Sequence, residues 1–200
     1  MKIWFATNNS HKKQELEAVL KRKLYIPSEE GINFNPDETG NTFYENSLLK
    51  AQELKKLLSG SGNFVIADDS GLCVDALGGR PGVFSARYGE ADGKKLTSAQ
   101  KNLLLLEELG ESENRSARFV CAMTLLRETE NLYIVQETIE GEIVRKSGMK
   151  GDGGFGYDPI FWLPSFGRTL AELSAEEKND ISHRGKAGKL VADILLHFKL

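Results

Sequence analysis

The sequence predicts an α/β protein in which a mixed β-sheet carries helices on its faces. Two observations support this fold class. Short apolar runs typical of buried strands alternate with amphipathic segments through the first half of the chain. Two longer strand-like segments, separated by a short polar stretch, then form a hairpin, and a strand and helices follow. Because the hairpin adds antiparallel strands to the alternating elements, the sheet is expected to be mixed.

Local signals place the elements of the first half. Thr42 and Glu45 have the spacing of a capping box, in which each side chain bonds the backbone of the other at the start of a helix. Gly60 is expected to close that helix. The expected elements are a strand at 3–6, a turn at 7–10 followed by a helix, a short strand at 24–26, a loop at 27–40, a helix from 42 to 60 and a strand at 64–67.

Similar signals organise the second half. Ser174 and Glu177 form a second capping box. The last helix places apolar side chains between Ala187 and Phe198 on one face, which is typical of a helix packed on a core. The expected elements are a tight loop at 78–82, a helix at 98–109, hairpin strands at 118–127 and 132–144, a short strand at 160–162 and the final helices.

Size and composition narrow the class of protein. The 200 residues suit one domain, residues 1–200, with room for two lobes. The net charge of −3 provides no global basic field, so neither nucleic acid nor a membrane is expected as a partner. No apolar run is long enough to span a bilayer or to form a signal peptide. Cys73 and Cys121 lack the spacing of a zinc site and suit core positions in a reducing compartment, so a cytoplasmic protein is expected.

A glycine-rich segment late in the chain matches a dinucleotide-binding pattern, but the residues that follow it exclude that interpretation. Gly151, Gly153 and Gly156 match the G-x-G-x-x-G pattern of dinucleotide-binding proteins. That pattern requires a helix directly after the glycines. Here a turn and a short apolar strand follow, and Pro159 disfavours helical geometry at the residue before it. The segment therefore indicates a flexible loop that presents the side chains of residues 155–158.

The turn after the first expected strand is a candidate phosphate site. A helix N-terminus offers free N–H donors and a partial positive charge, so it binds phosphate well. Lys12 adds a full charge in the first turn, where it opposes the helix dipole. The alternative is that Asn9 or Ser10 only caps the helix. The residues of this turn are Thr7, Asn8, Asn9, Ser10, His11 and Lys12.

Two adjacent carboxylates follow the buried strand at 64–67. Ligands of α/β proteins gather at the carboxyl ends of strands, and Asp68 and Asp69 lie at such an end. Neighbouring carboxylates are costly unless a cation or donors share the site, and Mg²⁺ suits carboxylates together with phosphates. The alternative is that one aspartate caps the following turn, and we expect one to do so while the other faces a ligand. Glu38 is a further acidic candidate that the residues alone do not single out.

The segment Ser182-His183-Arg184-Gly185 precedes the last helix. Ser182 is placed to cap that helix, and His183 and Arg184 would then project from its first turn as donors. Taken alone, such a pair is more typical of an ordinary polar surface, to which Lys178 would also belong.

Five blocks together resemble the inosine/xanthosine triphosphate pyrophosphatases, a family that removes aberrant purine nucleotides. The match covers nearly the whole chain in the family's order, with Asn8 where relatives often have glycine. The blocks are TNNSHK, ETGNTFYENSLLKA, ADDSGLCVDALGGRPGVFSARY, GGFGYDPIF and EEKNDISHRGKA.

This resemblance implies an elongated central sheet with two lobes around a cleft, a homodimer and a requirement for Mg²⁺. It also implies hydrolysis of ITP, dITP and XTP to the monophosphate and pyrophosphate. Asp69 would be the proton acceptor and a metal ligand, Glu38 a second metal contact, and Lys12 a charge that helps pyrophosphate leave. The remaining substrate contacts implied are Thr7 to His11, Lys50 and Ser70 for the triphosphate, and Phe155, Gly156, Tyr157, Asp158, Lys178, His183 and Arg184 for the base side.

The same resemblance explains the glycine-rich loop. Phe155 would stack on a purine while Asp158 and the neighbouring backbone contact its edge. His183 and Arg184 would donate to the oxygen of a 6-keto purine. They would reject adenine, whose 6-amino group is itself a donor. Two alternatives stay open: a pyrophosphatase directed at pyrimidine nucleotides, and a nucleotide sensor without activity. The role of Asp68 also stays open between orienting Asp69, holding the metal and capping a turn.

Overall fold

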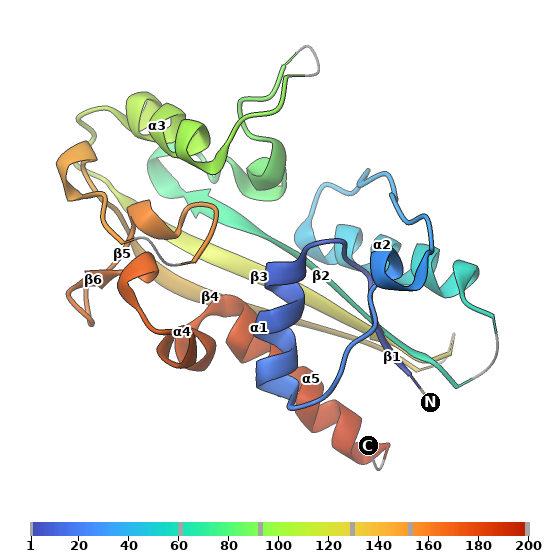
Figure 1. Cartoon of the computed structure of the whole chain (residues 1–200). Coiled ribbons are helices and arrows are strands. Elements are labelled where there is room, and N and C mark those ends of the chain that lie inside the picture. Colours follow the sequence, from blue (N-terminus) through green and yellow to red (C-terminus); the bar gives the residue numbers. More distant parts are fainter. Residues whose placement is uncertain (1, 60–61, 92–93, 129–130, 152–153, 199–200) are drawn as a thin grey trace. The chain divides into compact units, whose positions relative to one another are not determined.

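Figure 1 shows the computed structural model, which describes residues 2–59, 62–91, 94–128, 131–151 and 154–198. Within these residues the chain forms a six-stranded sheet whose strands lie in their order along the chain. The strands are β1 (Ile3–Phe5), β2 (Phe64–Val74), β3 (Ser116–Leu126), β4 (Leu132–Ile143), β5 (Phe161–Leu163) and β6 (Arg168–Thr169).

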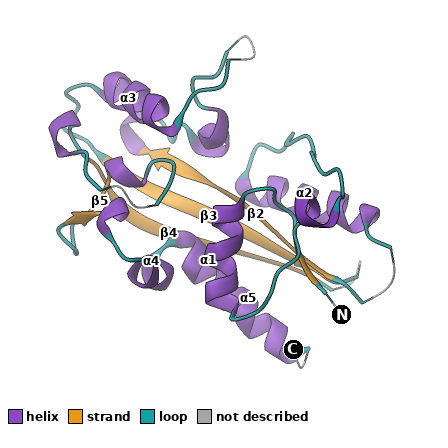
Figure 2. Ribbon diagram, in the orientation of Figure 1, coloured by secondary structure: helices purple, strands orange, loops and turns teal. Residues whose placement is uncertain are grey.

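The sheet is mixed, as predicted. β1 runs parallel to β2, with Trp4 opposite Val65. β5 is antiparallel to β4 and to β6, with Phe161 opposite Ile143. The helices are drawn beside the strands in Figure 2, and they are α1 (Ser10–Leu20), α2 (Phe43–Leu57), α3 (Ser98–Leu109), α4 (Ala175–Ile181) and α5 (His183–His197).

Both predicted capping boxes are confirmed. The hydroxyl of Thr42 accepts from the N–H of Glu45 at 3.3 Å, and the Glu45 carboxylate accepts from the N–H of Thr42 at 3.1 Å. The same reciprocal bonds join Ser174 and Glu177 at the start of α4. These caps satisfy N–H groups that a helix leaves unbonded at its first turn, so they fix where α2 and α4 begin.

Several expected elements differ in extent. Residues 24–26 form no strand, and only Tyr25 bridges to Trp4. Pro27, which has no N–H to donate, then begins a 3-10 helix (Pro27–Glu30) inside the expected loop. α2 ends at Leu57, and Gly60 lies outside the described residues. The strand expected to end at residue 67 continues to Val74, because partners from neighbouring helices satisfy its carboxylates.

The chain divides into two compact units. The first comprises residues 1–70, 121–137 and 183–200, and the second comprises residues 71–120 and 138–182. The single domain of two lobes expected from the sequence stays a prediction.

The first unit has a core on each face of its strands. Along β1 and β2 successive side chains point to opposite faces, as in any strand. Phe5, Phe64 and Ile66 pack with side chains of α1 and α5, and α1 and α5 pack against each other. Val65 and Ala67 pack on the other face with side chains of α2. The alternation therefore determines which helix each β2 side chain meets.

The second unit has its own core, in which α3 and β5 take part. Leu105 and Phe161 are fully buried there, and Phe119 and Phe161 form a tilted ring pair with centroids 4.8 Å apart. Tyr157 and Ile160, directly after the glycine-rich segment, belong to the same core. The loop that carries Phe155 is consequently anchored at its C-terminal end by apolar packing.

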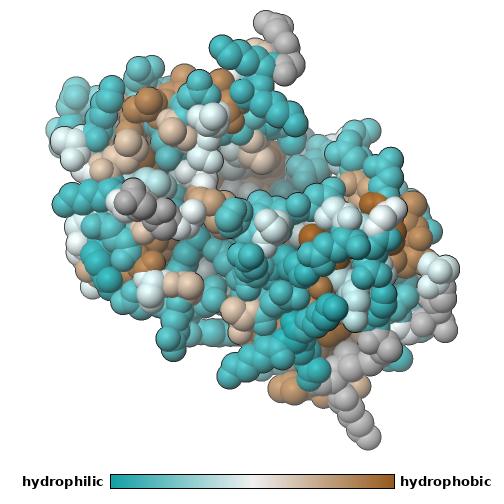
Figure 3. All heavy atoms as spheres, viewed as in Figure 1, coloured by the Kyte–Doolittle hydropathy of each residue, from teal (hydrophilic) through white to brown (hydrophobic). Residues whose placement is uncertain are grey.

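The face shown in Figure 3 is mostly hydrophilic, with hydrophobic side chains in small patches. None of the helices in the described part of the chain combines the length and apolar character needed to cross a membrane. Cys73 and Cys121 are both free thiols, and Cys121 is buried in the first unit's core.

Candidate functional site

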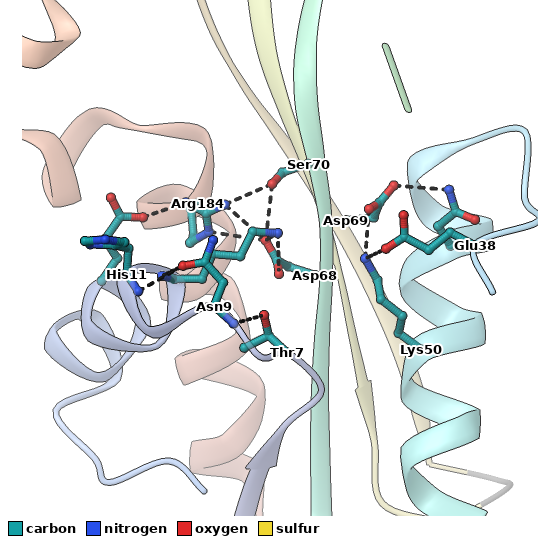
Figure 4. A network of polar contacts seen from close by, with 12 residues as sticks. Thr7, Asn9, His11, Glu38, Lys50, Asp68, Asp69, Ser70 and Arg184 are labelled. Atoms are coloured by element: carbon teal, nitrogen blue, oxygen red, sulfur yellow. Dashed lines mark hydrogen bonds and ion pairs between the residues drawn. The ribbon is translucent and has the colours of Figure 1, made fainter. Parts of the chain in front are cut away.

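The two adjacent aspartates of β2 point to opposite faces of the strand. Asp68 continues the row of Phe64 and Ile66, toward α1 and α5, whereas Asp69 continues the row of Val65 and Ala67, toward α2 (Figure 4). Neither aspartate ends the strand, so the expectation that one caps a turn was wrong. Both side chains instead bind cationic side chains supplied by helices.

Asp68 is held by two cations. Lys12 of α1 approaches its carboxylate at 2.9 Å, and the Nε and Nη2 atoms of Arg184 lie 3.2 Å from Oδ2. The Asp68 side chain is only 1% exposed. Burial alone would raise its pKa, but the charges of Lys12, Arg184 and Lys50 outweigh burial and hold the pKa well below its ordinary value. Asp68 is therefore ionised at neutral pH.

On the α1/α5 face of β2, Arg184 binds Glu15 and Ser70 as well as Asp68. Its Nη1 lies 2.5 Å from a carboxylate oxygen of Glu15, and its Nη2 donates to Ser70 Oγ at 2.9 Å. The guanidinium is almost completely buried, as is His183 beside it at the start of α5. The interpretation of this pair as an ordinary polar surface is wrong, because the charges of Asp68 and Glu15 compensate the desolvation of the guanidinium.

The segment before α1 is ordered by its own side chains. Asn9 caps the helix, and its Oδ1 accepts from the N–H groups of His11 at 2.9 Å and Lys12 at 3.3 Å. Thr7 Oγ1 accepts from the N–H of Asn9, and Asn8 donates to the carbonyl of Phe34 at 2.7 Å. Of the two candidates for the cap, Asn9 fills the role, while Ser10 is the first helical residue. This cap directs Lys12 toward Asp68.

Asp69 faces a different set of groups. Lys50 Nζ lies 2.8 Å from Asp69 Oδ1 and also 2.8 Å from Glu38 Oε1. Asn46 donates to the second oxygen of Asp69 at 3.3 Å. Burial raises the pKa of Asp69, and the charge of Lys50 opposes that rise without cancelling it. Asp69 is thus the more basic of the two neighbouring carboxylates.

Lys50 holds Glu38 and Asp69 around one positive charge. Burial would lower the pKa of Lys50, but the carboxylates of Asp69, Asp68 and Glu38 outweigh burial and raise it, so the ammonium stays charged. The described residues contain no group of three or more His, Cys, Asp or Glu side chains arranged to hold a metal. The pair of carboxylates that already shares a cation is nevertheless a hard oxygen donor set, which suits Mg²⁺.

The second unit contains the loop after Gly154. Asp158 Oδ2 accepts from the N–H of Phe155 and from Lys178 Nζ, both at 2.8 Å. The same ammonium lies 4.7 Å from the centre of the Phe155 ring, within the range of a cation–π contact. Both Asp158 and Lys178 are buried, so Lys178 is not the surface residue considered from the sequence.

Close packing explains why residue 154 of this loop is a glycine. A Cβ on Gly154 would stand 2.1 Å from Asp158 Oδ2, and the φ of +70° at Gly154 favours glycine as well. Asn102 of α3 donates to the carbonyl of Gly156 at 3.1 Å, and the Tyr157 hydroxyl donates to the carbonyl of Ser85 at 2.9 Å. Gly153 of the G-x-G-x-x-G pattern lies outside the described residues.

The predicted residues thus fall into three groups. Lys12, Ser70 and Arg184 surround Asp68, with Thr7 to His11 ordering the segment before Lys12. Lys50 and Glu38 surround Asp69. The residues of the third group belong to the second unit, and they are Phe155, Gly156, Tyr157, Asp158 and Lys178.

Three contacts escaped the prediction from sequence. Asn46, Glu15 and Asn102 are polar residues within helices, and no motif distinguishes them. The one available signal was that Asn46 precedes Lys50 by four residues, the spacing that places two side chains on one helix face.

The fold is that of an α/β protein with an open mixed sheet. Its candidate ligand site consists of carboxylate–cation clusters on both faces of β2. Comparison with known proteins narrows the class. The model of the Ham1 family matches residues 3–194, and the chain belongs to that family.

Relatives and solved structures agree with this assignment. The chain is 47% identical to a dITP/XTP pyrophosphatase of Treponema denticola over 94% of each chain. A HAM1 protein from Coxiella burnetii has a similar structure, with a TM-score of 0.85 and 39% identity over 98% of this chain and 99% of that one. The Staphylococcus aureus Ham1 protein gives a TM-score of 0.84 with 37% identity, covering 99% and 100% of the two chains.

Proposed function

We propose that this protein hydrolyses dITP, ITP and XTP to the monophosphate and pyrophosphate and so removes aberrant purine nucleotides. Relatives named dITP/XTP pyrophosphatase and membership of the Ham1 family support the reaction. The observation that carries the assignment to residues is the contrast within β2. A carboxylate of raised pKa, Asp69, stands beside one whose pKa is depressed, Asp68. Surroundings that shift the pKa values of two neighbouring carboxylates in opposite directions give one of them the role of a base and the other the role of a fixed charge.

Asp69 acts as the general base in this proposal. Asp69 shares a single cation, Lys50, with Glu38. Its carboxylate is therefore less fully neutralised than that of Asp68 and is the one placed to accept a proton from water. The activated water attacks the α-phosphorus, and pyrophosphate leaves. Asp68 keeps Lys12 and Arg184 charged and in place but takes no proton, because two cations already hold it as an anion.

Glu38 and Asp69 would hold a divalent cation, for which we propose Mg²⁺. When bound, the ion supplies charge neutralisation for the phosphates. Lys50 lies 2.8 Å from both carboxylates and is placed to neutralise the same negative charge. Lys12, in the first turn of α1, supplies a further positive charge for the departing pyrophosphate.

The Phe155 loop is proposed to bind the purine. Phe155 stacks on the base, and the Asp158–Lys178 pair fixes the loop that carries it. In this proposal Asp158 or the neighbouring backbone contacts the edge of the base. His183 and Arg184 are proposed to donate to the 6-keto oxygen of the base. All three guanidinium nitrogens also donate within the site, to Asp68, Ser70 and Glu15.

We further propose that the protein is a cytoplasmic homodimer. Two free thiols and the absence of a basic field agree with a soluble enzyme acting on the nucleotide pool in a reducing compartment.

A nucleotide panel tests the proposal. The protein is incubated with Mg²⁺ and separately with ITP, dITP, XTP, GTP, ATP, CTP or TTP, and the products are separated. We expect IMP, dIMP and XMP with pyrophosphate, and rejection of ATP by as much as ~10⁴-fold, since its amino group would leave buried donors unpaired. Preference for TTP or CTP would indicate a pyrimidine-directed enzyme, and binding of ITP without turnover would indicate a sensor.

A further inference from the structure

Asn46 lies at the centre of the Asp69 side, yet neither the motif nor the proposed reaction gives it a role. The residue is in the second turn of α2, four residues before Lys50, and its side chain is 0% exposed. A buried amide has to bond through both its oxygen and its nitrogen or lose stability. The partners of these two atoms therefore indicate what the amide does.

The two ends of the Asn46 amide bind two different parts of the site. Its Oδ1 accepts from the N–H of Gly40 at 2.8 Å, and its Nδ2 donates to Asp69 Oδ2 at 3.3 Å. Gly40 follows Glu38 by only two residues. The amide thereby connects the backbone of the Glu38 segment to the side chain of Asp69.

Close packing enforces this contact. A Cβ on Gly40 would stand 2.7 Å from Asn46 Oδ1 and 2.7 Å from the Cβ of Glu45. The next two N–H groups, of Asn41 and Thr42, both donate to the Glu45 carboxylate, at 2.8 and 3.1 Å. The whole segment from Gly40 to Thr42 is therefore fixed to the first two turns of α2.

α2 in turn is fixed to the sheet. The Ser47 hydroxyl lies 2.7 Å from the hydroxyl of Thr124 on β3, and both residues are fully buried. Ala51 and Leu54 of α2 also pack in the core with Val65 and Ala67, so the helix does not depend on the Ser47 bond alone. Asn46 is thus mounted on a rigid element, which is the condition for one side chain to set the geometry of others.

We propose that Asn46 is a positioning residue that sets the relative placement of the Glu38 and Asp69 carboxylates. The amide of Asn46 supplies an acceptor for Gly40 and a neutral donor for Asp69 at the same time, through two separate atoms. Lys50 brings charge to the two carboxylates, whereas Asn46 fixes their geometry without adding charge. This inference rests on the proposed function, in which Glu38 and Asp69 act together.

Three substitutions separate the parts of this role. Asn46→Ala removes both bonds, Asn46→Asp keeps the acceptor for Gly40 but replaces the donor to Asp69 by a carboxylate, and Gly40→Ala displaces the amide from the other side. Ser47→Ala is the matched control, because it removes a buried hydrogen bond from the same helix without touching either carboxylate.

Three measurements are made on each full-length variant: kcat and KM for dITP, hydrogen exchange of the Gly40 amide, and binding of Mn²⁺ without nucleotide. We expect Asn46→Ala to lower kcat by ~10–100-fold with little change in KM, the usual range when a contact that orients a metal ligand is lost. Its Mn²⁺ affinity should fall, and its Gly40 amide should exchange faster. Asn46→Asp should lower kcat while the Gly40 amide stays protected.

The control and the double variant sharpen the test. Ser47→Ala should lower the melting temperature and leave kcat and Mn²⁺ binding as in the wild type. The effects of Gly40→Ala and Asn46→Ala should not be additive, because both remove the Gly40–Asn46 contact, although the added Cβ of Gly40→Ala also meets the Cβ of Glu45.

The inference is overturned if the wild type is active and Asn46→Ala keeps its kcat and Mn²⁺ affinity, or if Ser47→Ala loses both as Asn46→Ala does. A wild type that releases no pyrophosphate from any purine nucleotide contradicts the proposed function instead. In that case the Mn²⁺ titration decides the inference by itself, and unchanged affinity in Asn46→Ala overturns it.

Discussion

Asp68 and Asp69 are neighbours in the chain but lie in opposite electrostatic surroundings on the two faces of β2. On the α1/α5 face, two cations reach Asp68 directly, and they hold its pKa below the ordinary value against complete burial. On the α2 face, Asp69 meets one cation, Lys50, which it shares with Glu38, and burial raises its pKa. Burial acts to raise both pKa values, and only the cations around Asp68 are numerous enough to reverse the direction of the shift.

This difference separates a structural anion from a reactive one. Asp68, once removed, would leave the half-buried Lys12 without this carboxylate. It would also leave the buried Arg184 one carboxylate short, with Glu15 still beside it. Asp69, once removed, would leave Lys50 still paired with Glu38. The two faces should therefore respond to the same substitution in different measurements, and the predictions below run from the largest expected effect to the smallest.

Asp68→Asn should lower the free energy of unfolding by about 3–5 kcal/mol, because breaking a buried ion pair leaves uncompensated charge in the interior. Urea unfolding followed by circular dichroism measures the loss. Asp69→Asn is the matched control, since it is the same substitution one residue further on. Equal losses in the two variants would show that the faces do not differ as the charges indicate.

Asp69→Asn should keep the fold and lower kcat for dITP by at least ~10², the usual scale for loss of a general base. Its free energy of unfolding should change little, because the folded state already disfavours the charged form of this carboxyl. Steady-state kinetics under saturating Mg²⁺ check this. Wild-type kcat in Asp69→Asn would remove Asp69 from the mechanism.

Lowering the pH should reduce the free energy of unfolding through the protonation of Asp68. A carboxyl whose pKa is depressed in the folded state contributes stability above its unfolded pKa, and that contribution disappears as pH falls through the folded pKa. For Asp68 the contribution is complete above its ordinary value of 3.8 and is lost below it. The free energy of unfolding should consequently fall more steeply below this pH in the wild type than in Asp68→Asn. Parallel curves for the two proteins would contradict the assigned direction.

Lys12→Ala should raise KM for ITP, XTP and GTP by similar factors of at least about tenfold, since a hydrogen bond between charged groups is worth about 1.5–3 kcal/mol. Its loss of stability should be smaller than that of Asp68→Asn, because Arg184 still pairs with the carboxylate. KM values for the three nucleotides and a urea titration are the measurements. A changed preference among the bases would place Lys12 at the wrong end of the substrate.

Much of the fold could be predicted because its signals are local. The apolar runs, the capping boxes at Thr42 and Ser174 and the neighbouring strands β3 and β4 are signalled by residues a few positions apart, while the turn expected at 128–131 lies partly outside the described residues. The end of β2 was missed because adjacent aspartates resemble a turn. Their strand geometry depends on Lys12, Lys50 and Arg184, which are distant in sequence.

The candidate site divides in the same way. The residue types and their order along the chain led to the family resemblance, and the Ham1 family assignment supports it. The partners of each group did not follow from them. Arg184 was expected to face a base and binds Asp68 and Glu15, and Lys178, considered for the surface, is buried against Asp158.

The sequence by itself determined the buried strand at 64–67, because a short apolar run is a local signal. That the strand continues through Asp68 and Asp69, and so sends them to opposite faces, was decided by the tertiary structure. The sequence also determined the helix starts, since a cap and its N–H groups are separated by only three residues. Only the tertiary structure decided which aspartate is the more basic and which amide joins Asp69 to the Gly40 backbone. Those properties depend on burial and on charges brought together from distant segments, and Coulomb interactions follow distance in space rather than distance along the chain.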